Sequence, residues 1–180
     1  MCKVKIIFYV LLIFLLRPYL NSELPAQLMD ISLGENLKEL KQKLRLRRVR
    51  TKCEVDKTYE IVYTEELSLK ITISVFQSKV YKIQITYNEN LIDESDWQSV
   101  YDRAKDTYGL PTKVYVDSIN DKITENYLWE NGNVKHIYQR IILNDKLKNF
   151  NILLVDVKTE QKISKLPRLK RFYYKIMNLF

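Results

Sequence analysis

Hydrophobic side chains recur at every second position in two stretches of this 180-residue sequence. In residues 69–75, Leu, Ile and Val alternate with Lys, Thr and Ser, and in residues 81–87 Tyr and Ile alternate with Lys, Gln and Thr. This period places the hydrophobic side chains on one face of a β-strand and the polar ones on the other. We therefore predict two antiparallel strands with one buried face, joined as a hairpin at residues 77–79.

Further segments are typical of strands, namely residues 59–63, 112–116, 123–130, 134–143 and 150–157. The dipeptide Asn131-Gly132, between two of them, is a strong signal for a type I′ hairpin. A two-residue loop there would place Trp129 opposite Val134 and Tyr127 opposite His136. One face of this hairpin would then carry Glu125, Tyr127, Trp129, His136, Tyr138 and Arg140.

Two segments are typical of amphipathic helices. In residues 33–47, Ser32 opens an S-x-x-E capping box, and leucines follow at helical intervals. In residues 95–109, Ser95 opens an S-x-x-Q box, and Gly109 supplies a helix end. We predict a helix in each segment.

A helix followed by a run of strands occurs twice in the predicted order of elements. Residues 30–90 form one such unit and residues 91–160 form the other. The repetition is either a diverged internal duplication or a coincidence, because the residue identities differ. The simplest architecture is one α+β domain over residues 23–160, in which two amphipathic helices pack on antiparallel β-meanders.

The first 22 residues have the pattern of a secretory signal peptide. Two lysines precede an apolar run over residues 6–16, which Arg17-Pro18 ends. The run is short for a membrane span, which needs about 20 apolar residues. We therefore predict a periplasmic or secreted protein, with cleavage after Ser22 or Ala26. A buried N-terminal helix or strand and an uncleaved membrane anchor are the alternatives.

The two cysteines cannot form a disulfide framework. Cys2 would leave with the signal peptide, so Cys53 would be the one cysteine of the mature chain. A lone thiol in an exported protein is either a buried weak hydrophobe or paired between chains, and we favour burial. No cysteine lies directly after the apolar run, so the lipobox of a lipoprotein is absent.

The formal net charge of +8 is concentrated at the two ends of the chain. Residues 1–22 and 161–180 contain no acidic residue, whereas residues 23–160 are close to neutral. Within that body, a basic run over residues 41–52 begins at the end of the first predicted helix, where cations complement the helix dipole. We favour a solvated helix end over an anion-binding patch. Nucleic-acid binding would require that the N-terminus is not an export signal.

The tail, residues 161–180, predicts a basic amphipathic helix. Its hydrophobic residues follow helical spacing beside a strip of cations. Such a helix can lie at an anionic membrane surface, or it can dock on the domain with its cations in solvent, and both options stay open. The residues that would reach a membrane surface are Arg168, Lys170, Arg171, Phe172 and Lys175.

The one histidine of the sequence, His136, forms with Glu125 and Tyr127 the cluster best suited to acid–base chemistry. No nucleophile motif accompanies this cluster, so a small envelope hydrolase that uses His136 is the alternative and not the leading hypothesis. A single histidine excludes a two-histidine metal site, and three glycines leave no glycine-rich phosphate loop. We predict no metal and no cofactor.

Aromatic residues dominate the predicted hairpin face. Tyr127, Trp129 and Tyr138, together with Arg140, combine large apolar area with polar tips, which suits a surface that binds a partner. The same residues suit a plain core, which is the default interpretation. The leading hypothesis is an exported, non-enzymatic protein-binding module.

Short motifs also resemble a group of small exported bacterial proteins. The segment Ile31-Ser32-Leu33-Gly34 before a helix and a β-meander, and Tyr108-Gly109-Leu110-Pro111 before the strand of Trp129, carry the resemblance. The chain is similar to the helix-plus-meander modules of the β-lactamase inhibitor protein and of the small lipoprotein in the outer-membrane β-barrel assembly machinery. This resemblance implies a partner that is another envelope or extracellular protein. The chain departs from it by lacking a lipobox cysteine and by its basic tail.

Overall fold

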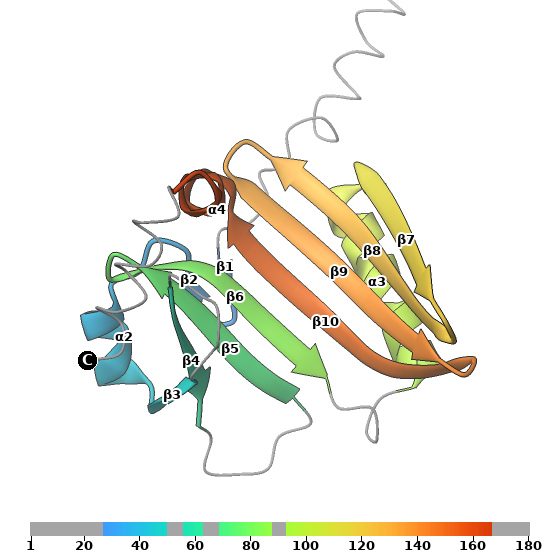
Figure 1. Ribbon diagram of the computed structural model, residues 1–180, viewed down its shortest axis with the longest axis horizontal. Coiled ribbons are helices and arrows are strands. Elements are labelled where there is room, and N and C mark those ends of the chain that lie inside the picture. The colour runs from blue at the N-terminus through green and yellow to red at the C-terminus, as the bar shows by residue number, and fades with distance from the viewer. Residues whose placement is uncertain (1–26, 50–55, 63–68, 88–92, 167–180) are drawn as a thin grey trace, which may run out of the picture.

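The computed structural model describes residues 27–49, 56–62, 69–87 and 93–166. Within them it confirms the predicted α+β class, with one large antiparallel sheet and three helices (Figure 1). The helices are α2 (Leu37–Lys43), α3 (Glu94–Tyr108) and α4 (Val157–Ser164). A separate short hairpin pairs β1 (Gln27–Leu28) with β2 (Ile31–Ser32). The strands of the sheet are β3 (Leu46–Val49), β4 (Lys57–Ile61), β5 (Leu69–Phe76), β6 (Lys79–Tyr87), β7 (Lys113–Ile119), β8 (Lys122–Asn131), β9 (Val134–Leu143) and β10 (Lys146–Asp156).

The order of the strands, β3-β4-β5-β6-β10-β9-β8-β7, is symmetric about its centre. α2 is followed by β3 to β6, which pair in succession, and α3 is followed by β7 to β10, which also pair in succession. The last strands of the two series, β6 and β10, pair antiparallel, with Ile85 opposite Ile152 and Ile83 opposite Leu154. Two helix-plus-meander units therefore share one continuous sheet.

The turn between β5 and β6 confirms the hairpin predicted at residues 77–79. Gln77 and Ser78 both have positive φ, 51° and 65°. Positive φ at both central residues is what a type I′ turn requires, and its twist matches that of the two strands. The turn forms here without glycine, so the alternating strands on either side, more than the turn residues, specify the hairpin.

The first helix is shorter than the sequence predicts, and the prediction that Ser32 caps it is wrong. α2 begins at Leu37, and the side chain of Asn36 accepts a hydrogen bond from the Lys38 backbone N–H at 2.9 Å. Ser32 belongs to β2, and its backbone N–H donates to the carboxylate of Glu35 at 3.1 Å. The S-x-x-E pair therefore stabilises a turn before the helix, because the chain must first leave β2.

The second helix lies close to its prediction, but its N-cap is Asp93, two residues before the predicted Ser95. α3 begins at Glu94, and the carboxylate of Asp93 accepts from the backbone of Ser95 and Asp96. The Asp96 side chain accepts in return from the Asp93 N–H at 3.0 Å, which completes a capping box. Gly109 ends the helix with φ at 77°, a conformation that glycine adopts at no steric cost. Ser95 thus lies inside the first turn.

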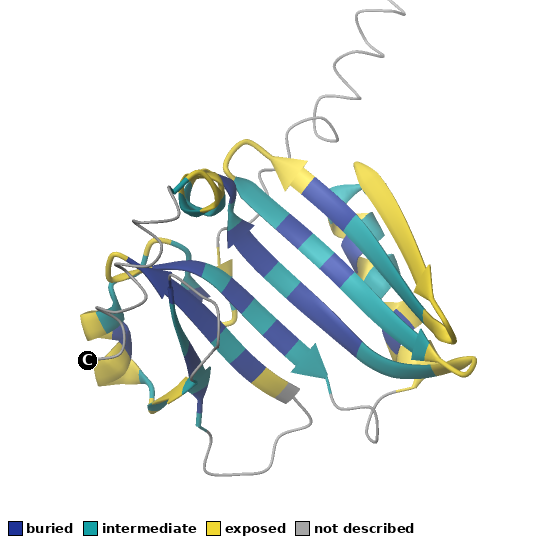
Figure 2. Ribbon diagram, viewed as in Figure 1, coloured by how far each residue is buried: buried dark blue, intermediate teal, exposed yellow. Residues whose placement is uncertain are grey.

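α2 and α3 pack on the same face of the sheet. Leu40 of α2 and Trp97 of α3 belong to one core cluster with Ile73, Ile83 and Leu154, and all five side chains are at most 1% exposed. Figure 2 shows the matching pattern, in which buried positions alternate with half-buried ones along the central strands. The core is therefore the layer between these two helices and the face of the sheet that they cover.

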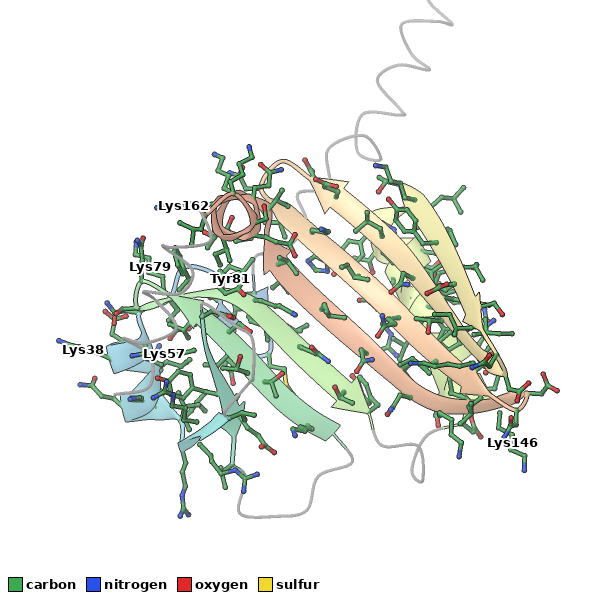
Figure 3. The ribbon with its side chains drawn as sticks, viewed as in Figure 1. Lys38, Lys57, Lys79, Tyr81, Lys146 and Lys162 are labelled. Carbon is green, nitrogen blue, oxygen red and sulfur yellow. The ribbon has the colours of Figure 1, made fainter. Side chains whose placement is uncertain are left out.

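α4 packs at one end of the opposite face. Phe76 lies there by the alternation of β5, and a register shift in the β5–β6 hairpin turns Tyr81 to the same face. Both side chains contact Ile163 and Leu166. The Lys162 ammonium lies 6.0 Å from the centre of the Phe76 ring, and Figure 3 shows Lys162 at the same end of the sheet as Tyr81. These contacts fix α4 against the strands.

The sequence places the start of the basic tail at residue 161, whereas α4 continues through Ser164. Residues 161–166 are thus attached to the domain. Several predictions concern segments outside the described residues, and they stay predictions. These segments are the signal peptide over residues 1–22, both cysteines, and the membrane-surface set Arg168, Lys170, Arg171, Phe172 and Lys175.

We expect Leu154→Ala to lower the free energy of unfolding by about 2–5 kcal/mol, because truncating a buried leucine leaves a cavity. Leu154 is 0% exposed and lies opposite Ile83, where the two units join. Denaturant unfolding should still show a single transition, since both units share this strand pair. The matched control is Leu153→Ala, a half-buried neighbour on the other face, for which we expect a clearly smaller loss. Equal losses, or two separate transitions, would contradict this account.

Candidate functional site

The sheet has two unlike faces. α2 and α3 cover the first face, which carries the main core. The second is called the open face below, and among the described residues α4 is the one helix on it, at one end. On β6, β10, β9 and β8 the open face carries Gln84, Asn151, Gln139 and Asn126, because side chains alternate between faces along each strand. Candidate sites are found on both faces.

The predicted aromatic binding set lies on the first face, beneath α3. Trp129 is 2% exposed and Tyr138 is 8% exposed, and their rings are 5.2 Å apart. The Tyr101 ring of α3 lies 4.5 Å from Tyr127, which is half-buried. The Trp129 indole N–H donates to the carbonyl of Gly109 at 2.9 Å, which ties the end of α3 to the sheet. The indole and Tyr138 therefore serve the core.

The pairing predicted within this hairpin is wrong, because the loop lies one residue later than predicted. Each residue of β8 therefore pairs two positions further along β9. The structure places Trp129 opposite His136, Tyr127 opposite Tyr138, and Asn131 opposite Val134. The loop residues are accordingly Gly132 and Asn133. Gly132, the first of the two, has positive φ of 59°, as a type II′ turn requires, whereas the prediction assumed a type I′ turn one residue earlier. The side chains keep their faces because the register differs by an even number.

His136 is not brought together with Glu125. The histidine is 2% exposed, and its ring meets the ring of Tyr108 edge-on at 5.2 Å between centres. Glu125 lies opposite Arg140, four residues further along β9, which is about 13 Å away along a strand. A substrate in solution therefore reaches neither the imidazole nor a histidine–carboxylate pair. No observation on the described residues favours the hydrolase alternative.

Glu125 instead belongs to a charged cluster at the N-terminal end of α3. Its Oε2 accepts from Arg140 Nε at 2.6 Å and from the Tyr127 hydroxyl at 2.6 Å. Arg140 Nη1 also pairs with Glu94 in the first turn of α3, and the guanidinium lies 5.9 Å from the ring centre of Trp97. Arg140 thus joins β8, β9 and α3.

The contacts within the cluster shift the pKa values of its members. The hydrogen bond from Arg140 holds the pKa of Glu125 below its usual value, because the cation favours the ionised carboxylate. Burial, followed by donation to Glu125 and the charge of that carboxylate, raises the pKa of Tyr127 to about 12. Burial likewise raises the pKa of Tyr138. At neutral pH the cluster therefore holds a carboxylate, a guanidinium and a neutral phenol, which is an arrangement for stability or recognition.

A cleft of about 610 Å³ lies beside this cluster. Arg140 and Glu94 line it on one side, and the β9–β10 turn lines it on the other, where Figure 3 labels Lys146. Its apolar wall comes from Ile123, Ile142 and Leu147, and its remaining polar residues are Asp93 and Asp145. Arg140 and Glu94 already pair with each other there, and the lining carries both acidic and basic side chains, so the cleft has no strong charge of one sign to select a ligand.

A row of four hydrogen-bonded amides crosses the open face. Gln84 Nε2 donates to Asn151 Oδ1 at 3.4 Å, Asn151 Nδ2 donates to Gln139 Oε1 at 2.9 Å, and Gln139 Nε2 donates to Asn126 Oδ1 at 2.7 Å. The donors all point the same way, and linked amides of this kind polarise one another. With strands about 4.8 Å apart, the row spans about 14 Å. Tyr115 of β7 lies opposite Asn126 and extends it to the sheet edge.

Sequence reasoning missed this amide row. Gln84 is visible as a polar residue in an alternating strand, but the same pattern predicts only a solvated side chain. The row exists because β6 pairs with β10, a contact between residues 67 positions apart for Gln84 and Asn151. An available signal was that an amide recurs at an outward-facing position in four different strands.

The described residues contain no group of three or more His, Cys, Asp or Glu side chains that could hold a metal ion. In the same part of the chain, no helix is long and apolar enough to cross a membrane.

Comparisons with known proteins reveal two distant similarities of structure. A DUF4309 family protein from Bacillus subtilis has 12% identity and a TM-score of 0.44, over 74% of this chain and 87% of that one. A cysteine-rich secretory protein from Staphylococcus aureus has 12% identity and a TM-score of 0.37, over 77% of this chain and 50% of that one. No family model matches the sequence, and no curated protein matches it. Neither structure is one of the exported modules that the sequence resembles.

We expect Glu125→Gln to lower the free energy of unfolding at neutral pH by roughly 1–3 kcal/mol, because a charge-assisted hydrogen bond to a partly buried group is lost. Since folding depresses the pKa of Glu125, its contribution is present above the ordinary carboxyl range and is lost as pH falls through the lowered value. Unfolding free energies measured from pH 7 to pH 3 should therefore fall less steeply in the variant. Glu130→Gln, at an exposed position on the same strand, is the control. A pH profile parallel to that of the unmodified protein would refute this role.

Proposed function

We propose that the protein is an exported, non-enzymatic module that binds another protein through the open face of its sheet. The observation that supports this most is the amide row of Gln84, Asn151, Gln139 and Asn126. Amide side chains at a surface donate and accept hydrogen bonds as a polypeptide backbone does. A protein partner therefore matches the chemistry of this face.

The amide row is held in place before any partner arrives. Asn151 is 6% exposed and uses both its donor and its acceptor within the row, and Gln84, Gln139 and Asn126 are half-buried. Side chains that are already ordered cost little additional entropy on binding. Tyr115, 52% exposed at the edge, adds the kind of aromatic residue that is enriched in protein interfaces. The face thus combines fixed polar groups with an aromatic rim.

The charges on the open face favour a protein over a nucleic acid. Arg47 and Lys70 both pair with Glu60, at 2.8 Å and 3.7 Å. Lys135 pairs with Glu160 of α4 at 3.0 Å. Binding to phosphates depends on cations that release counterions, and Arg47, Lys70 and Lys135 are each already engaged with a carboxylate. Within the described residues the basic groups of this face form no continuous unpaired stripe.

We also propose that the two units arose by duplication of one helix-plus-meander module. The symmetric strand order supports this, because a twofold relation between two such units makes their last strands, β6 and β10, antiparallel neighbours. A diverged duplication would explain why α2 and α3 take equivalent places before their meanders. In the group of exported proteins that the sequence resembles, such modules bind other proteins.

Export and a membrane-directed tail complete the proposal. Both rest on the sequence, because residues 1–26 and 167–180 lie outside the described part of the chain. Leu166 leaves the domain beside Phe76 and Tyr81, so the tail would continue from the α4 end of the open face. The cations of the tail would hold this end near an anionic surface. The partner would then be an envelope or extracellular protein.

A photo-crosslinking amino acid at Thr124 tests the binding face. Thr124 is half-buried on the open face, two residues from Asn126 on β8. In cells that naturally produce the protein, we expect illumination to give one specific adduct of higher mass on a denaturing gel. The same amino acid at Arg103, which is exposed on α3, should give none.

Gln139→Leu is the variant in which binding through the open face should be lost, and it is tested with the same photo-crosslinking amino acid at Thr124. The substitution keeps the size of the side chain but removes its bonds to Asn151 and Asn126. In a variant that melts within a few degrees of the unmodified protein, we expect most of the Thr124 adduct to disappear. An adduct that forms equally well from Arg103, or that survives Gln139→Leu, would refute binding through the open face.

Vesicle flotation tests the tail separately. We expect the chain that lacks residues 1–22 to float with phosphatidylglycerol vesicles and not with phosphatidylcholine vesicles, and to detach at high salt. A matched chain that ends at Leu166 keeps α4 and its contacts and should stay unbound. Equal flotation of the two chains would remove the tail from the proposal and leave the protein-binding face intact.

A further inference from the structure

The two edges of the sheet differ sharply. One edge, β3, has four residues, and Arg47 and Arg48 within it are exposed. Short edges with cationic side chains resist pairing with another chain. The other edge, β7, has seven residues, and every one of them is exposed, as Figure 2 shows. Only the second edge is built to accept a further strand.

The exposed side chains of β7 are largely hydrophobic. Val114 is 51% exposed, Tyr115 52%, Val116 64% and Ile119 63%. The strand pairs with β8 without a register shift, so its free edge is straight over its whole length. A long, regular and apolar edge presents unpaired backbone groups to any strand that can align with them. This edge is therefore suited to pair with a strand whose side chains are complementary to those of β7.

We propose that β7 pairs antiparallel with β7 of a second copy of this chain, about a twofold axis through Tyr115. Lys113 then lies opposite Asp117 of the second copy, and by symmetry the same ion pair forms twice. Val114 lies opposite Val116 of the second copy on the other face, also twice. Opposite charges and β-branched pairs directly across a strand pair are both stabilising.

Charge complementarity selects this register. Lys113 and Asp117 are about 13 Å apart within one strand, so they cannot pair with each other in the monomer. An axis through Val116 would instead place Tyr115 opposite Asp117, and Lys113 opposite Ile119, with no ion pair. The axis through Tyr115 is therefore the register in which the strand is complementary to itself, as an interface between identical copies requires.

The same axis aligns the open faces of the two copies. Lys113, Tyr115 and Asp117 share the face of Asn126, because Tyr115 lies opposite Asn126 on β8. The two Tyr115 rings would meet at the axis, and the two amide rows would run toward it from opposite sides. A pair of eight-stranded sheets would thus become one continuous sheet. This pairing does not depend on the proposed function.

Reversal of single charges tests the pairing in the chain that lacks residues 1–22. Sedimentation velocity over a range of concentrations should show a concentration-dependent dimer of the unmodified chain. Lys113→Asp and Asp117→Lys should each weaken the dimer at least tenfold, because like charges then face each other twice. The double variant with both changes should restore dimerisation to within about threefold of the unmodified chain.

Both positions are exposed, so the thermal midpoint of each dilute variant should match that of the unmodified monomer. Lys38→Glu and Glu39→Lys, made singly at exposed positions of α2, alter the net charge by the same amounts as the two single reversals and should leave dimerisation unchanged. A chain that stays monomeric at all concentrations would overturn the proposal. Single variants that dimerise normally, or a double variant that does not recover, would overturn the register and with it the pairing of Lys113 with Asp117.

Discussion

The antiparallel pairing of β6 with β10 is the contact on which the rest of the structure depends. It joins two meanders that would otherwise each be a four-stranded sheet with a bare hydrophobic edge. Ile83, Ile85, Ile152 and Leu154, on the two strands, are all at most 7% exposed. The pairing also sets Gln84 beside Asn151, so the amide row on the open face is a direct product of it.

The position of α3 follows from the same contact. Trp97 packs against Phe150 of β10 at 5.5 Å between ring centres, and Tyr108 packs against His136 of β9. The helix therefore covers the half of the sheet to which its own meander belongs. The charged cluster around Arg140 forms at its N-terminal end, where Glu94 reaches the sheet. Among the described elements, α4 is the one helix on the open face, and β7 pairs with no strand besides β8.

Much of the fold could be predicted from local patterns. The alternation over residues 69–75 and 81–87 fixes the two strands and their buried face, because a period of two has no other structural meaning at that length. Gly109 marks the end of α3 for a steric reason that sequence alone reveals. The cap of α2 could not be predicted, because Ser32 is first engaged in β2 and tertiary pairing overrides the local motif.

The candidate site was less accessible to sequence reasoning. Whether Trp129 and Tyr138 form a surface or a core depends on which face α3 covers, and the alternation of the strands does not decide that. The choice of loop residues at Gly132 decides whether Glu125 lies opposite Arg140, as observed, or opposite Tyr138 and diagonal to His136, as predicted. The amide row and the β7 edge depend on strand order. Distant pairing therefore decides most of what the surface offers to a partner.

The place of β10 in the sheet has a consequence for how the molecule is made. A ribosome delivers β3 to β6 long before Lys146–Asp156, yet β6 needs those residues to complete its ladder. Until Lys146–Asp156 is made, the edge of β6 that faces β10 has no partner strand among the described elements that precede it. A non-local pairing of this kind forms slowly, and a sheet edge exposed before it forms is open to aggregation and to capture by chaperones.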